Sequence, residues 1–433
     1  MTTAAAAPRA PGHDAAPPRI AYVMSRFPRL TETFILSELL ALEAAGVEVA
    51  IYPLLREEAA LVQPGAADLV RRAHYLPFVS PAILASQLHY LRDRRRRRRY
   101  VRALLDVIGG TWRSPNFLLG GLGIFPKVAH AAREMEERGI EHVHCHFANH
   151  PALAGFVVHR LTGIPYSFTA HGSDLHVDRT MLPAKVAEAA FVVTISEDNR
   201  RLIEATCGPA AAPKIEVIHC GVDPHAFQPV ERPARAGLRI VVVGTLHEVK
   251  GQVHLVDACR LLVDQGVDVS CRLIGDGPDR EMLRERIGEL GLSGRVELSG
   301  RMTSDDVARA LADADVLVTP SVPTKSGKRE GIPVVLMEAM ATGLPVVASR
   351  LSGIPELVED GTSGLLVPPA DPPALAAALR RLAEDPALRA RLGAAGRETV
   401  LREFDVATNA RTLLARIVSS LGTTARTTRG ADR

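Results

Sequence analysis

The sequence lacks any uninterrupted apolar stretch of the length that a membrane-spanning helix needs. Such a helix takes about 18 or more apolar residues in a row, and the 433-residue chain contains no such run. Residues 1–18 are rich in alanine and proline and have no apolar segment of the kind that a secretion signal carries. We therefore expect no transmembrane helix and interpret residues 1–18 as a disordered tail.

Cysteine is scarce, and neither sign of charge dominates. The five cysteines are an odd number scattered through apolar stretches, which argues against a disulfide framework and for a reducing compartment. The 52 basic and 49 acidic residues leave a net charge of only +3, so the chain has no overall field that would attract nucleic acid. The sequence predicts a globular cytoplasmic protein of two or three domains.

One short segment departs from this balance of charge. Six consecutive arginines follow Arg92 and lie between Leu88, Tyr90 and Leu91 on one side and Tyr100 on the other. A run of like charges is most often a solvated helix face. The alternative is attraction to anionic lipid, worth about 1 kcal/mol for each basic residue near the surface. The membrane candidates are Arg94, Arg95, Arg96, Arg97, Arg98 and Arg99.

Short apolar runs alternate with helical patterns, and the two halves of the chain repeat this order. Residues 19–24 begin one buried-strand pattern and residues 239–244 begin another, each followed by a loop and a helical pattern, at 32–45 and 252–265. This alternation is typical of parallel sheets covered by helices. We predict an α/β protein of two Rossmann-like domains that face an interdomain cleft, where loops after the strands meet. The segment 120–123, Gly-Gly-Leu-Gly, is predicted to be a loop.

Two carboxylates, Glu330 and Glu338, bracket the segment EGIPVVLME. Pro333 suits the first position of a helix, because its fixed φ fits there and its missing N–H is not needed. Free backbone N–H groups at such a helix start form a seat for phosphate. Carboxylates beside that seat are suited to accept hydrogen bonds from hydroxyl groups. Together these features indicate a nucleotide-sugar site.

These segments resemble the retaining glycosyltransferases of family 4, which have the GT-B fold. The resemblance covers about residues 19–421, and its opening segment is most similar to transferases of exopolysaccharide and colanic acid biosynthesis. It implies an N-terminal acceptor domain at 19–228, a C-terminal donor domain at 229–403, a helix at 404–421 that returns to the N-terminal domain, and a flexible tail at 422–433. The segments that carry it are SRFPRLTETFILSELLALEAAGVEV, FTAHGSDL, VVTISE, IHCGVD, GTLHEVKG, LIGDGPDREML, EGIPVVLMEAMATGLPVVAS and GIPELVEDGTSGLLVPP.

The resemblance also implies roles for residues of the C-terminal half. Glu330 would contact the hydroxyls of the donor sugar and stabilise a cationic transition state, and Glu338 would hold the ribose. Lys250 would pair with the diphosphate, because enzymes of this fold usually lack a catalytic metal. The family commonly has an arginine where this chain has Thr245, and we expect Lys328 or Arg329 to compensate. Further donor-binding candidates are Gly244, Arg301 and the backbone of Gly331, Ile332, Val334 and Val335.

In the N-terminal half, His171 matches the family histidine that lies close to the donor sugar. Asp174 is a neighbour suited to orient this histidine or the substrate. The loop at 25–33 stands where relatives carry a glycine-rich phosphate loop but lacks the paired glycines. Thr31, Glu32 and Thr33 are therefore candidates for acceptor or phosphate contact.

No metal site is expected. Asp313 and Asp315 resemble a metal-binding Asp-x-Asp but lie where a helix meets a strand. The residues His142, His144, Cys145, His146 and His150 resemble a metal site. Successive side chains of a strand point to opposite faces, so these five cannot all converge.

The sequence thus predicts a retaining hexosyltransferase that moves a sugar from a nucleotide-diphosphate donor to a saccharide acceptor, which we expect to be lipid-linked. A lipid-linked acceptor favours the membrane interpretation of the arginine run, at the inner face of the plasma membrane. Two alternatives remain open: a sugar-nucleotide epimerase of the same fold, and a non-catalytic protein that binds nucleotide sugar or membrane.

Overall fold

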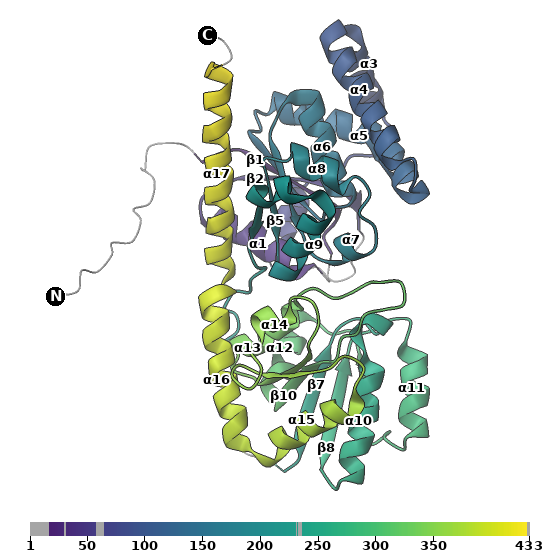
Figure 1. The fold of residues 1–433 in the computed structure, drawn as a ribbon, viewed down its shortest axis with the longest axis vertical. Coiled ribbons are helices and arrows are strands. Elements are labelled where there is room, and N and C mark those ends of the chain that lie inside the picture. Colours follow the sequence, from purple (N-terminus) through teal and green to yellow (C-terminus); the bar gives the residue numbers. More distant parts are fainter. Residues whose placement is uncertain (1–16, 30–31, 58–64, 231, 233–235, 431–433) are drawn as a thin grey trace, which may run out of the picture.

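Two parallel six-stranded sheets, one in each half of the chain, form the framework of the molecule (Figure 1). The structure is a computed structural model that describes residues 17–29, 32–57, 65–230, 232 and 236–430. Helices flank both sheets, so the predicted α/β fold with two parallel-sheet domains is confirmed. None of the helices in these ranges is long and apolar enough to cross a membrane.

The first domain is built on strands whose central members are completely buried. Alternate residues of β1 face different layers: Val23 packs with the helices on one side of the sheet, and Tyr22 packs with α1 and α17 on the other. The strands are β1 (Ile20–Phe27), β2 (Val49–Arg56), β3 (His142–His146), β4 (Tyr166–Ala170), β5 (Phe191–Thr194) and β6 (Ile215–Val217). The helices are α1 (Thr33–Ala44), α2 (Ala66–Arg72), α3 (Pro81–Arg92), α4 (Arg94–Thr111), α5 (Pro115–Glu137), α6 (His150–Thr162), α7 (Ser173–His176), α8 (Leu182–Glu188), α9 (Glu197–Cys207) and the 3₁₀ turn η1 (Pro209–Lys214).

The second domain repeats this plan with shorter strands of valine, leucine and isoleucine. Its strands are β7 (Leu238–Val243), β8 (Val269–Ile274), β9 (Val296–Gly300), β10 (Val316–Thr319), β11 (Val346–Ser349) and β12 (Leu365–Val367). Its helices are the 3₁₀ turn η2 (Glu248–Lys250), α10 (Gln252–Asp264), α11 (Arg280–Glu289), α12 (Ser304–Asp313), α13 (Val334–Ala341), α14 (Ile354–Leu357), α15 (Pro372–Glu384) and α16 (Pro386–Glu403).

The order of the strands shows where ligands should bind. The first sheet runs β2-β1-β3-β4-β5-β6, and the second runs β12-β11-β10-β7-β8-β9. The direction of winding therefore reverses between β1 and β3 and between β7 and β10. In open parallel sheets, ligands bind beyond the carboxyl ends of the strands at such a reversal. Loops from both reversals meet in the cleft described below.

The last helix, α17 (Val406–Gly430), runs from the second domain along the side of the first (Figure 1). Leu413 and Ile417 are buried in the core that contains β1 and α1. Asn409 Nδ2 donates to the carbonyl oxygen of His219 at 3.0 Å, and Arg416 forms an ion pair with Glu216. The predicted end at residue 421 is wrong, because the helix continues to Gly430 through residues that include no proline.

The prediction of a loop at 120–123 is also wrong, because these residues lie inside α5. Packing explains why glycine occurs there despite its low helix propensity. A Cβ at position 120 would lie 2.2 Å from Nε2 of His150, and one at position 121 would lie 3.2 Å from Leu153. Gly120 and Gly121 let α5 approach α6 closely, which a local pattern does not reveal.

Candidate active site

A cavity of about 650 Å³ lies between the two domains. The first domain contributes the loop before α1 and the loops after β3, β4 and β6, and the second contributes the loops after β7 and β10 and the start of α13. Side chains at its wall include Glu32, Phe34, His171, Cys220, Lys250, Lys328, Glu330 and Glu338. Most of the predicted site residues that the structure describes therefore lie at this one cavity.

Glu330 and Lys250 form an ion pair across the second-domain side of the cavity. Lys250 ends the 3₁₀ turn that follows β7, whereas Glu330 belongs to the long loop between β10 and α13. The hydroxyl of Ser321, just beyond β10, donates to the other carboxylate oxygen of Glu330. The side chains of Lys250 and Glu330 are 24% and 13% exposed. A cation and a carboxylate are thus held together at the winding reversal, facing the cavity.

Helix α13 directs its N-terminus at the same cavity. Pro333 is the residue before its first turn, one position earlier than predicted, and Val334 begins the helix. Gly331, Ile332, Val334 and Val335 all line the cavity. The first N–H groups of a helix have no partner within the helix and carry partial positive charge. This end of α13 is therefore suited to bind an anionic group.

Glu338, on the second turn of α13, is half-buried and lines the cavity. Burial raises the pKa of its carboxyl group from the ordinary value of 4.5 to about 7. The unfolded chain releases this proton near pH 4.5, whereas the folded protein keeps it until about pH 7. Ionisation of Glu338 consequently lowers the free energy of unfolding as the pH rises from about 4.5 to about 7.

We expect Glu338→Gln to stabilise the ligand-free protein at pH 8 and to leave it nearly unchanged at pH 4.5. Since one unit of pKa is worth 1.36 kcal/mol, the rise from 4.5 to about 7 gives a gain at pH 8 of about 3 kcal/mol. Thermal unfolding at the two pH values measures it, with Glu398→Gln at an exposed position as the control. An equal shift of the unfolding midpoint at both pH values would contradict this explanation.

Contacts between the domains bring the two walls of the cavity together. A Cβ at Gly331 would lie 2.7 Å from the carbonyl oxygen of His171, so only glycine fits there. The carboxylate of Glu356 in α14 accepts hydrogen bonds from the N–H groups of Glu197 and Asp198 at 2.8 and 3.1 Å. An acidic side chain thus caps the start of α9 across the domain boundary. No local pattern of residues indicates this contact.

Thr245 places a small side chain at the cavity, where the family resemblance led us to expect an arginine. Its carbonyl oxygen accepts from the Nε2 of Gln252 at 3.0 Å. Lys328 and Arg329 also line the cavity and bring positive charge to it. Arg301 is exposed and outside the cavity lining, although its neighbour Met302 belongs to that lining.

Glycines shape the loop that carries Thr245. Gly244 has φ of 156° and Gly275 has φ of 142°, both in a region that favours glycine. A Cβ on Gly275 would lie 1.9 Å from the carbonyl oxygen of Gly244. The Gly275-Asp-Gly-Pro turn therefore packs directly beneath this loop and holds it in place.

On the first-domain side, His171 is buried with one edge at the cavity. Burial, followed by the neighbouring His146, lowers the pKa of His171 well below its ordinary value, so the imidazole is neutral at neutral pH. Asp174 lies outside the cavity lining. Its carboxylate accepts from the backbone N–H groups of Ala148, His171 and Gly172 at 2.6, 3.0 and 2.8 Å. Asp174 thus holds the loop that carries His171.

Glu32 and Thr33 line the cavity at the start of α1, and Thr31 lies outside the described residues. Arg29 Nη1 donates to Oε1 of Glu32 at 2.6 Å, while Oε2 has no hydrogen-bond partner among the described residues. Burial raises the pKa of this carboxyl group. The contact of Glu32 with a hydroxyl group of a ligand stays a prediction.

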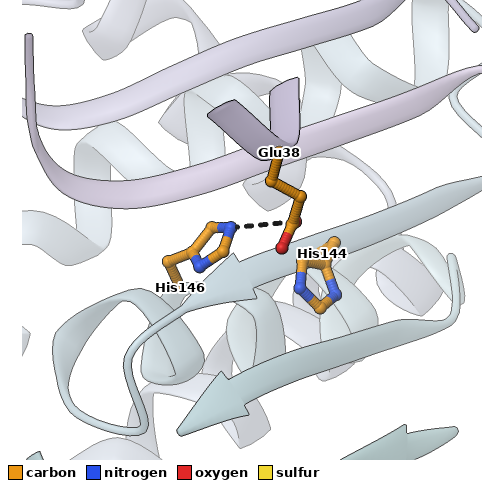
Figure 2. Close-up of side chains that lie close together, drawn as sticks. All are labelled: Glu38, His144 and His146. Atoms are coloured by element: carbon orange, nitrogen blue, oxygen red, sulfur yellow. Dashed lines mark ion pairs between the residues drawn. The ribbon is translucent and has the colours of Figure 1, made fainter. Parts of the chain in front are cut away.

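His144 and His146 lie on one face of β3 (Figure 2), whereas Cys145 packs in the core on the other face. The five residues do not all converge, as predicted. However, the ligand atoms of His144 and His146 lie within 4.8 Å of each other and of the Glu38 carboxylate, which comes from α1. Sequence reasoning missed Glu38 because it lies about a hundred residues before these histidines. Asp313 and Asp315 are engaged elsewhere, since Arg239 donates to them at 2.7 and 2.9 Å.

Two family models match the two halves of the chain. One, described as Glycosyltransferase Family 4, covers residues 31–226, and the other, described as Glycosyl transferases group 1, covers residues 229–399. The amylovoran biosynthesis glycosyltransferase of Erwinia amylovora is 38% identical over 243 residues, which are 54% of this chain and 59% of that protein. The chain thus spans little more than half the length of that relative.

A further relative is matched over more of its length. The 2-deoxystreptamine glucosyltransferase of Streptomyces kanamyceticus is 33% identical over 279 residues, 59% of this chain and 70% of that protein. Among solved structures, the Anabaena protein HepE in complex with UDP superposes with a TM-score of 0.69 at 19% identity, covering 93% of this chain and 100% of that chain. This structural likeness shows a shared fold.

Proposed function

Since this chain belongs to the glycosyltransferases of family 4 and group 1, we propose that it transfers a sugar from a nucleotide-diphosphate donor to a saccharide acceptor in exopolysaccharide biosynthesis. One observation supports this proposal most strongly. The Lys250–Glu330 pair, the start of α13 and Glu338 all face a single interdomain cavity. Relatives support it: one is named for amylovoran biosynthesis, and a neighbour of the same fold was solved with UDP-glucose.

The proposed binding mode assigns each part of the donor to a part of the cavity. The diphosphate would lie at the start of α13 and against Lys250, whose ammonium has three N–H donors and can serve both phosphate and Glu330. Glu338 would accept hydrogen bonds from the ribose. The sugar would lie between Glu330 and His171, with closure of the domains excluding water.

The proposed reaction retains the configuration of the sugar through attack on the same face that the diphosphate leaves. The bond between the anomeric carbon and the phosphate oxygen breaks, and the bond to the acceptor oxygen forms. The proton of the acceptor hydroxyl passes to the departing phosphate. In this scheme Lys250 and the α13 N-terminus stabilise the charge of the leaving diphosphate, and Glu330 stabilises the positive charge on the sugar. The scheme uses no metal ion.

Slow hydrolysis of the donor separates this proposal from the two alternatives. A transferase without acceptor should release nucleoside diphosphate and free sugar, because water replaces the acceptor. A non-catalytic binding protein should release neither, and an epimerase should change the configuration of the sugar in the nucleotide sugar. NMR of UDP-glucose and GDP-mannose mixtures with the protein distinguishes the three outcomes, and absence of hydrolysis and transfer would refute the transferase assignment.

We further propose that helices α3 and α4 place the enzyme on an anionic membrane at the cytoplasmic face, where a lipid-linked acceptor would be found. All six arginines of the run are exposed in the first turns of α4, with no acidic residue among them. Positive charge at a helix N-terminus is unfavourable for the helix dipole. An anionic surface would relieve this cost, which a purely solvated face would not.

Exposed apolar side chains accompany the arginines. They recur at helical spacing, so each helix presents an apolar stripe. Helices α3 and α4 lie at the outer edge of the first domain, on the side away from α17 (Figure 1). The apolar residues that are more than 40% exposed there are Leu84, Leu88, Leu91, Val101, Leu105 and Trp112.

Replacing the six arginines of the run by glutamine should lower binding to anionic vesicles by about 100-fold or more, because each contributes up to about 1 kcal/mol. Flotation with phosphatidylglycerol-containing and purely zwitterionic liposomes measures it. The matched control removes six exposed arginines of the second domain: Arg272, Arg284, Arg309, Arg350, Arg380 and Arg402. Equal flotation of the two variants would show that the six arginines have no specific role in membrane binding.

A further inference from the structure

A chain of polar contacts leads from the core of the first domain to the cavity. The hydroxyl of Tyr22 donates to Oε1 of Glu38 at 2.7 Å, and Nε2 of His146 lies 3.2 Å from the same oxygen (Figure 2). Nδ1 of His146 lies 3.0 Å from Nε2 of His171. Tyr22 and His146 are completely buried, so these contacts are shielded from water.

The chemistry of these groups indicates which of their polar atoms carry hydrogen. Burial, followed by Glu38, raises the pKa of Tyr22 well above its ordinary value, so Tyr22 keeps its proton and donates it. A carboxylate only accepts, so the 3.2 Å contact between Nε2 of His146 and Glu38 favours the tautomer of His146 that carries its hydrogen on Nε2. With its hydrogen on Nε2, His146 has a lone pair on Nδ1, which accepts from Nε2–H of His171.

The remaining nitrogen of His171 is left for the cavity. Its Nδ1 has one hydrogen-bond partner among the described residues, the Cys220 thiol, with Sγ at 3.7 Å. A thiol is a weak donor, and both His171 and Cys220 line the cavity. Nδ1 is therefore an acceptor that a hydroxyl group of a ligand can take over from the thiol.

We propose that Glu38 and His146 are positioning residues that hold His171 in the Nε2–H tautomer, so that its Nδ1 accepts a hydrogen bond from a hydroxyl of the donor sugar. This inference rests on the proposed function for the identity of the ligand. The aromatic rings of Phe34 and Phe147, whose centroids lie 4.6 and 4.8 Å from that of His171, fix the plane of the imidazole. Glu38 and His146 fix which nitrogen carries the proton.

The same residues could be suspected of holding a metal ion, because Glu38, His144 and His146 are close together. The hydrogen bonds of His144 favour the tautomer role. Its Nδ1 and Nε2 lie 2.8 and 3.0 Å from the hydroxyls of Ser167 and Thr169, so both nitrogens already have partners. His144 thus belongs to a separate hydrogen-bonded cluster in the sheet, with Ser167 and Thr169, and no hydrogen bond links it to His171 among the described residues.

This difference supplies a matched pair of variants, His146→Phe and His144→Phe. Both positions are completely buried, two residues apart on one face of β3. Long-range ¹H–¹⁵N spectra of the ligand-free protein, labelled in histidine, report the tautomer of His171, with His171→Gln identifying its signals. We expect Nε2–H in the wild type and in His144→Phe, and a mixed or Nδ1–H state in His146→Phe.

Activity gives the second measurement, using hydrolysis of UDP-glucose or GDP-mannose, whichever the wild type turns over faster. We expect kcat/KM to fall about 10- to 100-fold in His146→Phe, the range seen when a supporting hydrogen bond is removed, and less than about 3-fold in His144→Phe. Glu38→Gln keeps an acceptor oxygen and should preserve the tautomer and most of the activity. Glu38→Leu should lose both the Nε2–H tautomer of His171 and most of the activity. If His146→Phe does not fold, the comparison of Glu38→Gln with Glu38→Leu tests the inference.

The tautomer is read without substrate, so its result stands even if no nucleotide sugar is turned over. Three outcomes would overturn the inference: Nδ1–H on His171 in the wild type, an unchanged tautomer in both His146→Phe and Glu38→Leu, or one bound metal ion per chain that is lost equally in His144→Phe and His146→Phe. Elemental analysis of the purified wild type and variants measures the bound metal.

Discussion

Glu330→Gln should lower kcat by about 100- to 1,000-fold while leaving KM for the donor within a few-fold, the magnitude expected when one group that stabilises transition-state charge is removed. Glutamine keeps the shape of the side chain and an oxygen that can accept from Ser321. It loses the negative charge that would oppose the developing positive charge of the sugar. The loss should therefore appear in the chemical step, measured by donor hydrolysis and by transfer.

Glu338→Gln is the control for this result, because both carboxylates lie at the same cavity and only their proposed roles differ. Loss of ribose binding should raise KM more than it lowers kcat. If Glu330→Gln raised KM alone, or if the two variants had the same kinetic pattern, the division of roles between the two carboxylates would be wrong.

Lys250→Met should lower kcat/KM by about 100- to 1,000-fold, because two effects act together. The leaving diphosphate loses a cation that neutralises it. Glu330 also loses its ion-pair partner, which leaves a carboxylate with only 13% of its side chain exposed and, among the described residues, one remaining donor, Ser321. Removing one partner of such a pair is more costly than the pair itself is worth.

Lys250→Arg restores the charge and serves as the test of this explanation. It should recover part of the activity, since a guanidinium can pair with both phosphate and carboxylate. Steady-state kinetics of the three proteins with the same donor provide the comparison. Activity of Lys250→Met within a few-fold of the wild type would show that Lys328 or Arg329, also at the cavity, carries the charge instead.

The donor side of the site could be predicted from the sequence because its residues lie close together in short segments of the chain. Glu330, Pro333 and Glu338 lie in one segment, and a strand–loop–helix pattern places such a segment at the carboxyl end of a sheet. The same holds for Lys250 after β7 and for His171 after β4. The alternation of strands and helices likewise predicted both parallel sheets, which the structure confirms.

The parts that were missed depend on contacts between distant segments. Glu38 meets His146 because β1 and β3 pair and α1 covers them. Ser321 meets Glu330 only after the loop beyond β10 folds back, and Glu356 caps α9 across the domain boundary. None of these pairings leaves a periodic pattern in the chain. The glycines inside α5 were misread for the same reason, since a tertiary contact with α6 overrides their helix propensity.

The central claim is that the cavity between the domains binds a nucleotide sugar through its diphosphate and ribose. Thermal unfolding of the wild type, Lys250→Met and Glu338→Gln with a panel of UDP-, GDP- and ADP-sugars tests it most directly, because a ligand that binds the folded state raises the unfolding midpoint. We expect one member of the panel to stabilise the wild type, and the same compound to stabilise both variants much less. If no nucleotide sugar stabilises the wild type, or if all three proteins are stabilised equally, the claim is contradicted.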